Sequence, residues 1–172
     1  PDPVLYYEHI ALYRDPRIKQ ILAAEAPAPI PIGRAALRRQ GNDLAFISYG
    51  AYVHAALRVA ERLAADGIQS SVLDLRSLAP LDREAVLACA RHCSRVLIVH
   101  EDARTGSVGE SLAAIIQEEA FESLDAPVRI LAALDGMWTA FEGTTLDCLA
   151  ESRSRLGLAG PPVAERERDG LD

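Results

Sequence analysis

Basic residues are the minority in this chain of 172 residues, which has 18 Lys and Arg against 25 Asp and Glu and a formal net charge of −7. Because nucleic-acid binding rests on a basic surface, this balance argues against a nucleic-acid partner. No apolar run approaches the roughly 18 residues that a membrane-spanning helix needs, and the first residues show no basic-then-apolar signal pattern. We therefore expect neither a nucleic-acid nor a membrane partner.

Cysteines and aromatic residues are also scarce. The three cysteines, Cys89, Cys93 and Cys148, are too few for a disulfide framework, which favours a reducing cytoplasm. Aromatic residues make up 5% and hydrophobic residues 49%, so the core must be built mainly from Ala, Leu, Ile and Val. The length suits one ordinary domain.

Changes in composition divide the chain into four predicted segments: residues 1–9, 10–33, 34–135 and 136–172. The first is β-prone and is expected to be the last strand of an upstream domain. The second holds four prolines, which exclude a continuous helix and indicate a linker. The third has a regular α/β pattern. The fourth is predicted to be a divergent, partly helical tail with a disordered end.

Within the third segment, apolar periodicity predicts five strands and three helices. The strands are expected at 35–39, 44–49, 71–75, 95–100 and 128–132, and the helices at 51–65, 82–92 and 109–121. Strands that alternate with helices of this length are typical of a largely parallel sheet with helices on both faces.

Polar side chains gather where the predicted strands end, which is where open α/β sheets bind ligands. Those ends read Ser48-Tyr49-Gly50, Asp74-Leu75-Arg76 and His100-Glu101-Asp102. An imidazole beside two carboxylates has the chemistry to bind a metal or relay a proton. Three adjacent residues of an extended chain cannot all face one point, however. Hydrogen bonds that fix a loop or an interface are therefore the favoured interpretation.

Three weaker signals are interpreted as structural. Residues 105–111 look like the turn that opens a helix, although free N–H groups there can hold an anion. Cys89, His92 and Cys93 share a helical turn, but structural zinc needs a fourth ligand, which favours a buried cysteine pair beside a surface histidine. His54 lies early in a helix, where a structural role is favoured. The residues alone thus predict an α/β domain without a self-sufficient active site.

Several motifs, taken in order, resemble one family. They are the segments 3–9, 30–35, 48–54, 74–82, 99–106 and 119–128. Together they resemble the C-terminal part of β subunits of 2-oxo acid dehydrogenase complexes over residues 3–135. The resemblance implies a transketolase C-terminal domain, a three-layer α/β/α fold with a five-stranded mixed sheet. In that fold the short strand at 35–39 runs antiparallel to the others.

The resemblance also implies a function. It places the chain in a thiamine-diphosphate enzyme that decarboxylates a branched-chain 2-oxo acid or pyruvate and acylates a lipoyl group. Thiamine diphosphate and Mg²⁺ would be bound by other domains, because the G-D-G diphosphate motif does not occur in these residues. The implied partners are an α-type diphosphate-binding subunit or fused segment, a second β-type subunit and the lipoyl acyltransferase core.

The chain alone is accordingly expected to be inactive, with no catalytic, cofactor-binding or metal-binding residue of its own. We expect four of its residues at an interface or along a channel: His54, Arg76, His100 and Glu101. His100 with Glu101 is the favoured pair, since the imidazole titrates near neutral pH and the carboxylate can orient it.

The likeness weakens after Asp135, where the family continues with Thr-Pro and a Pro-rich stretch and this chain has Gly136–Gly143 instead. A reading-frame error in a GC-rich gene and a genuinely divergent tail are the two explanations, and the docking of the acyltransferase core depends on which holds. Two other functions also stay open. One is the same domain in a transketolase or a deoxyxylulose-phosphate-synthase-like enzyme, which needs more cations than Arg76 and Arg104. The other is a stand-alone flavodoxin-like binding module.

Overall fold

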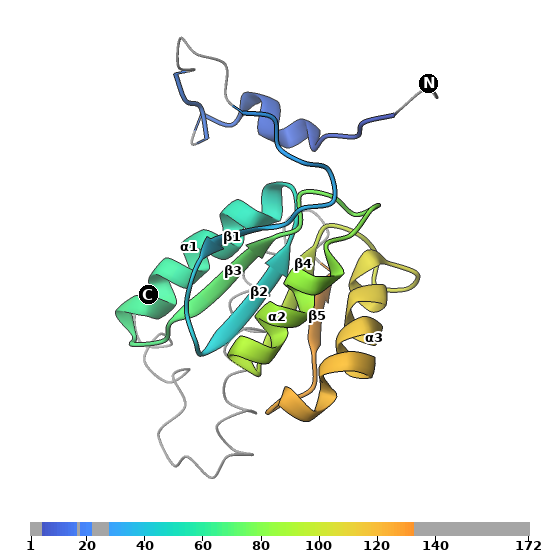
Figure 1. The fold of residues 1–172 in the computed structure, drawn as a ribbon. Helices are drawn as coiled ribbons and strands as arrows, with labels where there is room; N and C mark the ends of the chain where they lie inside the picture. The colour runs from blue at the N-terminus through green and yellow to red at the C-terminus, as the bar shows by residue number, and fades with distance from the viewer. Residues whose placement is uncertain (1–4, 17, 22–27, 133–172) are drawn as a thin grey trace.

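The fold is a five-stranded mixed sheet with helices on both faces, seen in a computed structural model that describes residues 5–16, 18–21 and 28–132 (Figure 1). The strands are β1 (Ala36–Arg39), β2 (Leu44–Ser48), β3 (Ser70–Asp74), β4 (Val96–His100) and β5 (Arg129–Ala132). Their order is β1-β3-β2-β4-β5, and only the β1–β3 pair is antiparallel. The predicted mixed α/β sheet is confirmed, and each predicted strand boundary lies within one residue of the observed one.

The central strands are apolar along their whole length because helices cover both faces of the sheet. Every residue of β2 and of β4 is buried, and the register places Ile47 between Leu73 of β3 and Ile98 of β4. The edge strand β1 is only partly buried, carries two arginines and shifts register between Leu37 and Arg39. Charges and an irregularity of this kind protect an edge strand from pairing with another chain.

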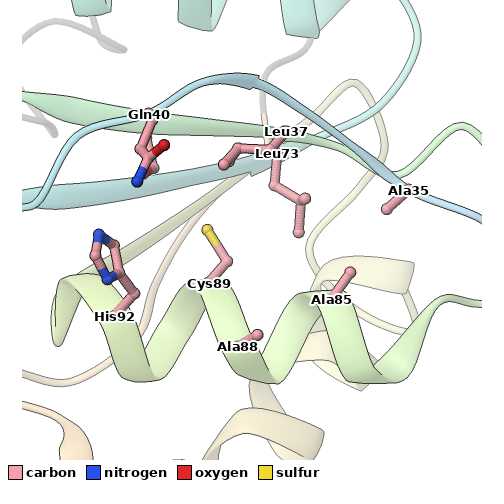
Figure 2. A pocket seen from close by; sticks show the side chains of 9 residues that line it. Ala35, Leu37, Gln40, Leu73, Ala85, Ala88, Cys89 and His92 are labelled. Atoms are coloured by element: carbon pink, nitrogen blue, oxygen red, sulfur yellow. The ribbon is translucent and has the colours of Figure 1, made fainter.

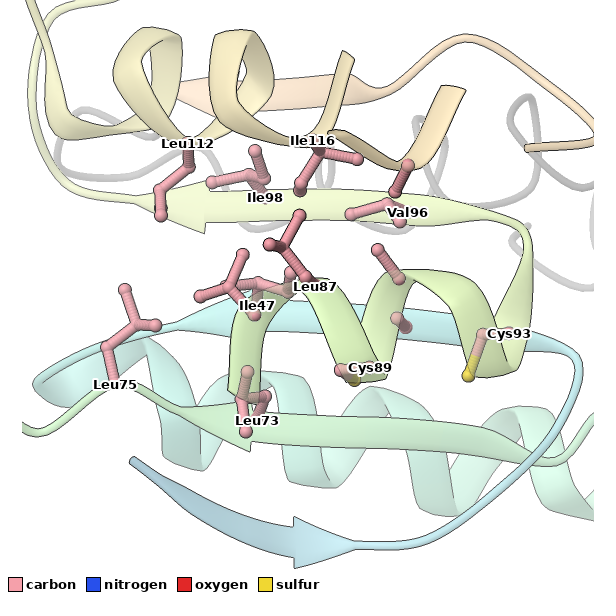
Figure 3. Close-up of a cluster of buried hydrophobic side chains, with 14 residues drawn as sticks. Ile47, Leu73, Leu75, Leu87, Cys89, Cys93, Val96, Ile98, Leu112 and Ile116 are labelled. Atoms are coloured by element: carbon pink, nitrogen blue, oxygen red, sulfur yellow. The ribbon is translucent and has the colours of Figure 1, made fainter. Parts of the chain in front are cut away.

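The helices divide between the two faces. Helix α1 (Ala51–Ala65) covers one face, and α2 (Arg83–Cys93) and α3 (Val108–Ala120) cover the other (Figure 1). Figure 3 shows the second face, where Ile47, Leu87 and Ile98 meet in one apolar cluster. Cys89 and Cys93 are buried at the edge of this cluster while His92 is exposed, as the sequence predicted.

Side-chain caps fix the starts of two helices. Asp82 accepts the Ala85 N–H at 3.2 Å to cap α2, and its second oxygen accepts the Ala35 N–H at 3.0 Å. These two hydrogen bonds lower the pKa of Asp82, and the bond from Ala35 has the larger effect. Ser107 accepts the Glu110 N–H to cap α3, and the Glu110 carboxylate accepts the Gly106 N–H at 2.9 Å. The turn at 105–111 is therefore the start of a helix, as predicted.

An N-terminal segment, residues 5–21 of which all but residue 17 are described, lies beyond the carboxyl ends of the parallel strands β2 to β5 (Figure 1). It holds a short 3-10 helix, η1 (Ile10–Arg14), which the sequence analysis did not predict. Residues 5–9 pair with no strand among the described residues, so their place in an upstream sheet stays a prediction. The tail 136–172 and both explanations for it lie outside the described residues. Within the described ranges, no helix has the length and apolarity to cross a membrane.

Candidate functional site

The sheet has one point at which its strand order reverses. From β2 the chain crosses through α1 to β3 on one side, whereas from β4 it crosses through α3 to β5 on the other. Strands β2 and β4 are neighbours in the sheet. Their carboxyl ends therefore form a crevice of the kind that binds ligands in open α/β sheets. The residues that meet there are His9, Tyr49, Gly50, His100 and Glu101, which we call the strand-end cluster.

His100 lies at the bottom of the strand-end cluster with an exposed fraction of 0%. Its Nδ1 accepts the Asp102 N–H at 3.1 Å, which assigns the ring proton to Nε2, and no described residue hydrogen-bonds Nε2. Gly109, in the first turn of α3, leaves the space for this nitrogen, because a Cβ there would overlap it. Burial lowers the pKa of His100, with Asp102 opposing, so the imidazole is neutral at pH 7.

Tyr49 forms the second wall of the cluster. Its ring is nearly parallel to that of His100, at an interplanar angle of 5° and a centroid separation of 6.4 Å. Burial, with added repulsion from the carboxylates of Asp102 and Glu101, raises the pKa of Tyr49. The phenol is therefore a neutral group at physiological pH and not a base.

The Glu101 carboxylate makes its hydrogen bond to the N-terminal segment and not to His100. Its carboxylate hydrogen-bonds Nε2 of His9, a residue 92 positions away in the sequence. The His9 ring also packs against Gly50, where a Cβ would lie 3.1 Å from His9 Cδ2 and where φ is +60°. Glycine is required here both by the positive φ and by the close approach of the ring. The chain's own histidine thus occupies the mouth of the crevice.

The three residues of the His-Glu-Asp run face different ways, as the sequence analysis expected of an extended chain. His100 is buried, Glu101 meets His9, and Asp102 is exposed and accepts the Ala103 N–H. Sequence reasoning missed His9, since it was assigned to an upstream strand and nothing in the spacing linked it to Glu101. Tyr49 was noted at a strand end, but its stacking on His100 was not foreseen.

His54 and Arg76 interact with other residues than those that His100 and Glu101 contact. Burial and the positive charge of Arg38 lower the pKa of His54, whereas Asp74 opposes them. Arg38 itself lies 4.0 Å from Asp74, and Asp74 accepts the Arg76 N–H at 3.1 Å. The Arg76 side chain is exposed on a backbone with φ of +56°. The four predicted site residues therefore divide between the ends of β3 and β4.

A pocket of about 390 Å³ lies elsewhere, between strands β1 and β3 and helix α2 (Figure 2). Its wall is mostly apolar and includes Leu37, Leu73, Ala88 and Cys89. The hydrogen bond with the Cys93 thiol, together with burial, raises the pKa of the Cys89 thiol, so the sulfur is a poor nucleophile. His92 lines one end of the pocket, and its Nε2 is already hydrogen-bonded to Asn42 at 2.8 Å. This pocket has no pair of groups arranged for acid–base chemistry.

The residues that the structure describes do not fit a diphosphate with its metal. Among them, no three His, Cys, Asp or Glu side chains come together to hold a metal ion. At the start of α3, the Gly106 and Glu110 N–H groups are bound by the helix's own side chains. His9 fills the crevice at the end of β2 and β4. No step of a cofactor reaction is assigned to these residues.

The fold defines a doubly wound α/β domain whose strand ends are occupied by its own N-terminal segment. The family described as "Transketolase, C-terminal domain" matches residues 33–147, and the chain belongs to this family. It is 44% identical over 137 residues to the 2-oxoisovalerate dehydrogenase subunit beta of Bacillus subtilis, a match that covers 78% of this chain and 40% of the relative.

Other relatives carry related names. The chain is 39% identical over 137 residues to the pyruvate dehydrogenase E1 component subunit beta of Staphylococcus epidermidis, covering 80% of this chain and 41% of that protein. Among solved structures, a split-gene transketolase described as an inactive beta4 tetramer matches with a TM-score of 0.59 and 26% identity, covering 82% of this chain and 46% of that one. The chain thus spans about two fifths of the length of the curated relatives it matches.

Proposed function

We propose that the chain is the C-terminal assembly domain of the β-type part of a thiamine-diphosphate-dependent 2-oxo acid dehydrogenase. The larger enzyme would oxidatively decarboxylate a branched-chain 2-oxo acid or pyruvate and transfer the acyl group to a lipoyl group. The observation that carries this proposal is the 44% identity to a 2-oxoisovalerate dehydrogenase β subunit across most of the chain. Since the match covers 40% of that relative, the activity belongs to a longer protein than these residues.

In this proposal the domain contributes packing and not chemistry. Thiamine diphosphate and Mg²⁺ would be bound by other domains of the larger enzyme. The N-terminal segment exposes large apolar side chains, with Tyr7 at 86% and Leu5 at 78%. Exposed tyrosines and leucines on a segment outside the core are typical of a surface that a partner covers.

The proposed partners are those that a β-type subunit requires. They are an α-type diphosphate-binding subunit or fused segment, a second β-type subunit and the lipoyl acyltransferase core, all in the cytoplasm. His54, Arg76, His100 and Glu101 are proposed to lie at an interface or along a substrate channel, since His54 lies in the first turn of the helix after β2, Arg76 follows β3, and His100 and Glu101 lie at the end of β4.

A transketolase-like enzyme is the second candidate, because a split-gene transketolase shares the fold at a TM-score of 0.59. Enzymes of that class handle phosphorylated sugars, which favour cationic side chains at the binding site. The strand-end cluster holds two imidazoles, a phenol and a carboxylate, and no arginine or lysine. This composition, together with the higher identity to the dehydrogenase subunit, favours the dehydrogenase.

The proposal is tested by expressing the whole reading frame that contains these residues together with the adjacent α-type chain. We expect a co-purifying complex that transfers acyl groups from a branched-chain 2-oxo acid or pyruvate to lipoamide, and no turnover from the 172 residues alone. Ketol transfer between phosphorylated sugars would replace the dehydrogenase by the transketolase. A stable monomer with neither activity, from a frame with no further domain, would favour the flavodoxin-like binding module.

A further inference from the structure

Two imidazoles contact the loop after β4, and a proton affects the two contacts in opposite ways. His9 binds the carboxylate of Glu101, so a proton on His9 adds an ion pair to this hydrogen bond. His100 accepts the Asp102 N–H through the lone pair of Nδ1, so a proton on Nδ1 removes the acceptor. Glu101 and Asp102 are adjacent, and the loop that carries both is therefore held by the neutral form of His100.

The surroundings of His100 favour this neutral form. Among the described residues, the groups that face the ring are Tyr49 just after β2, the backbone of Gly109 in α3, and the carboxylate of Asp102 on its own loop. The phenol is neutral, and the start of a helix carries a partial positive charge that disfavours a nearby cation. Only Asp102 favours the imidazolium, and it is exposed to water.

We propose that His100 is a buried proton switch that sets how firmly the N-terminal segment is held. One proton from solvent binds Nδ1, the Asp102 N–H loses its acceptor, and the loop that carries Glu101 leaves its position against His9. Raising the pH removes the proton from Nδ1 and restores the contact between Glu101 and His9. The switch acts on the chain's own segment and does not depend on which 2-oxo acid the larger enzyme takes.

The direction of the pH dependence follows from burial. Because burial lowers the pKa of His100, the unfolded chain binds a proton at a higher pH than the folded chain does. The contribution of this contact is present above the ordinary histidine pKa of about 6.5 and is lost as the pH falls below it.

Nuclear magnetic resonance of the 172-residue chain tests the switch. At pH 7.5 we expect the ring proton of His100 on Nε2, and a titration midpoint below 6.5. The Asp102 amide should shift with that same midpoint, and its protection from hydrogen exchange, corrected for the intrinsic effect of pH, should fall at least about tenfold. A proton on Nδ1 at pH 7.5, a midpoint at or above 6.5, or a protection factor that does not change with pH would overturn the proposal.

Two variants distinguish the effect of His100 from that of the contact between His9 and Glu101. His9→Gln keeps a donor for Glu101 and has no imidazole of its own, so the loosening of residues 5–21 by acid should persist in this variant and report on His100 alone. His100→Asn keeps an acceptor near the position of Nδ1 that does not titrate, so the Asp102 amide should stay protected at both pH values. If His100→Asn does not fold, the titration of the parent chain and of His9→Gln still decides between the outcomes.

Discussion

The domain body, residues 34–132, and the N-terminal segment, residues 5–21, use the same kinds of apolar residue in opposite ways. In the body, Ile47 has an exposed fraction of 0% and lies between two strands and a helix layer. In the segment, Ile10 is 82% exposed and packs in no cluster of the core. The body therefore buries the apolar side chains of its core, with Leu37, Leu78 and Phe121 as exposed exceptions, whereas the segment leaves its apolar side chains for something else to cover.

The two regions are also joined differently. The body is held by a sheet whose every strand has at least one hydrogen-bonded neighbour, and by two apolar layers. The segment contacts the body through polar groups: His9 hydrogen-bonds Glu101 and its ring packs against Gly50, and the Asp15 carboxylate interacts with His54 of α1. This difference implies that the body sets the folding stability, while the position of the segment depends on a few polar contacts that pH and partners can change.

The largest expected effect comes from the body. Ile47→Ala removes side-chain atoms from a site with no exposed surface, which leaves a cavity that neighbouring strands cannot collapse. We expect a loss of about 2–5 kcal/mol in the free energy of unfolding, measured by urea denaturation. Ile10→Ala is the matched control, the same change at an exposed site, and we expect it within about 0.5 kcal/mol of the parent chain. Similar losses for both variants would contradict the comparison.

A smaller effect is expected where the segment's linker joins the body. Asp82 caps α2 and also accepts the Ala35 N–H just before β1. Asp82→Ala removes both acceptors, and we expect a loss of about 1–2 kcal/mol by urea denaturation at pH 7. Asp82→Asn retains an oxygen that can cap a helix, so most of the stability should be retained.

The stability at low pH should distinguish Asp82→Asn from the parent chain. The Ala35 and Ala85 N–H groups lower the pKa of Asp82, so the folded state binds its proton at a lower pH than the unfolded state does. Its contribution is present above the ordinary aspartate value of about 4 and is lost as the pH falls through the folded pKa. The stability of Asp82→Asn should therefore fall less than that of the parent chain in this range, and an equal fall would rule out this role for the charge.

These contrasts also show which parts of the molecule the sequence could predict. The apolar periodicity of β2 and β4 and the Asp82 cap are local signals, so their boundaries were predicted to within one residue. The reversal of β1 came only from the family resemblance, because periodicity does not give strand direction. The Glu101–His9 contact joins residues 92 positions apart across a linker. No local pattern encodes such a contact, and adjacency in the sequence directed attention to Glu101 as a partner of His100, whereas its carboxylate hydrogen-bonds His9.

The smallest change in stability, and the sharpest test of the comparison, is expected from His9→Ala. The imidazole and the Glu101 carboxylate are both partly exposed, with side-chain exposed fractions of 22% and 41%, and such pairs contribute about 0–1 kcal/mol. Global unfolding in urea should therefore change little. Residues 5–21, however, lose a hydrogen bond that joins them to the body, so trypsin should cleave after Arg14 and Lys19 several times faster at pH 7.5. His9→Gln, which can still donate to Glu101, should cleave at close to the parent rate. An unchanged cleavage rate in His9→Ala would mean that other contacts hold the segment. The segment would then be attached to the body more firmly than its exposed apolar side chains indicate.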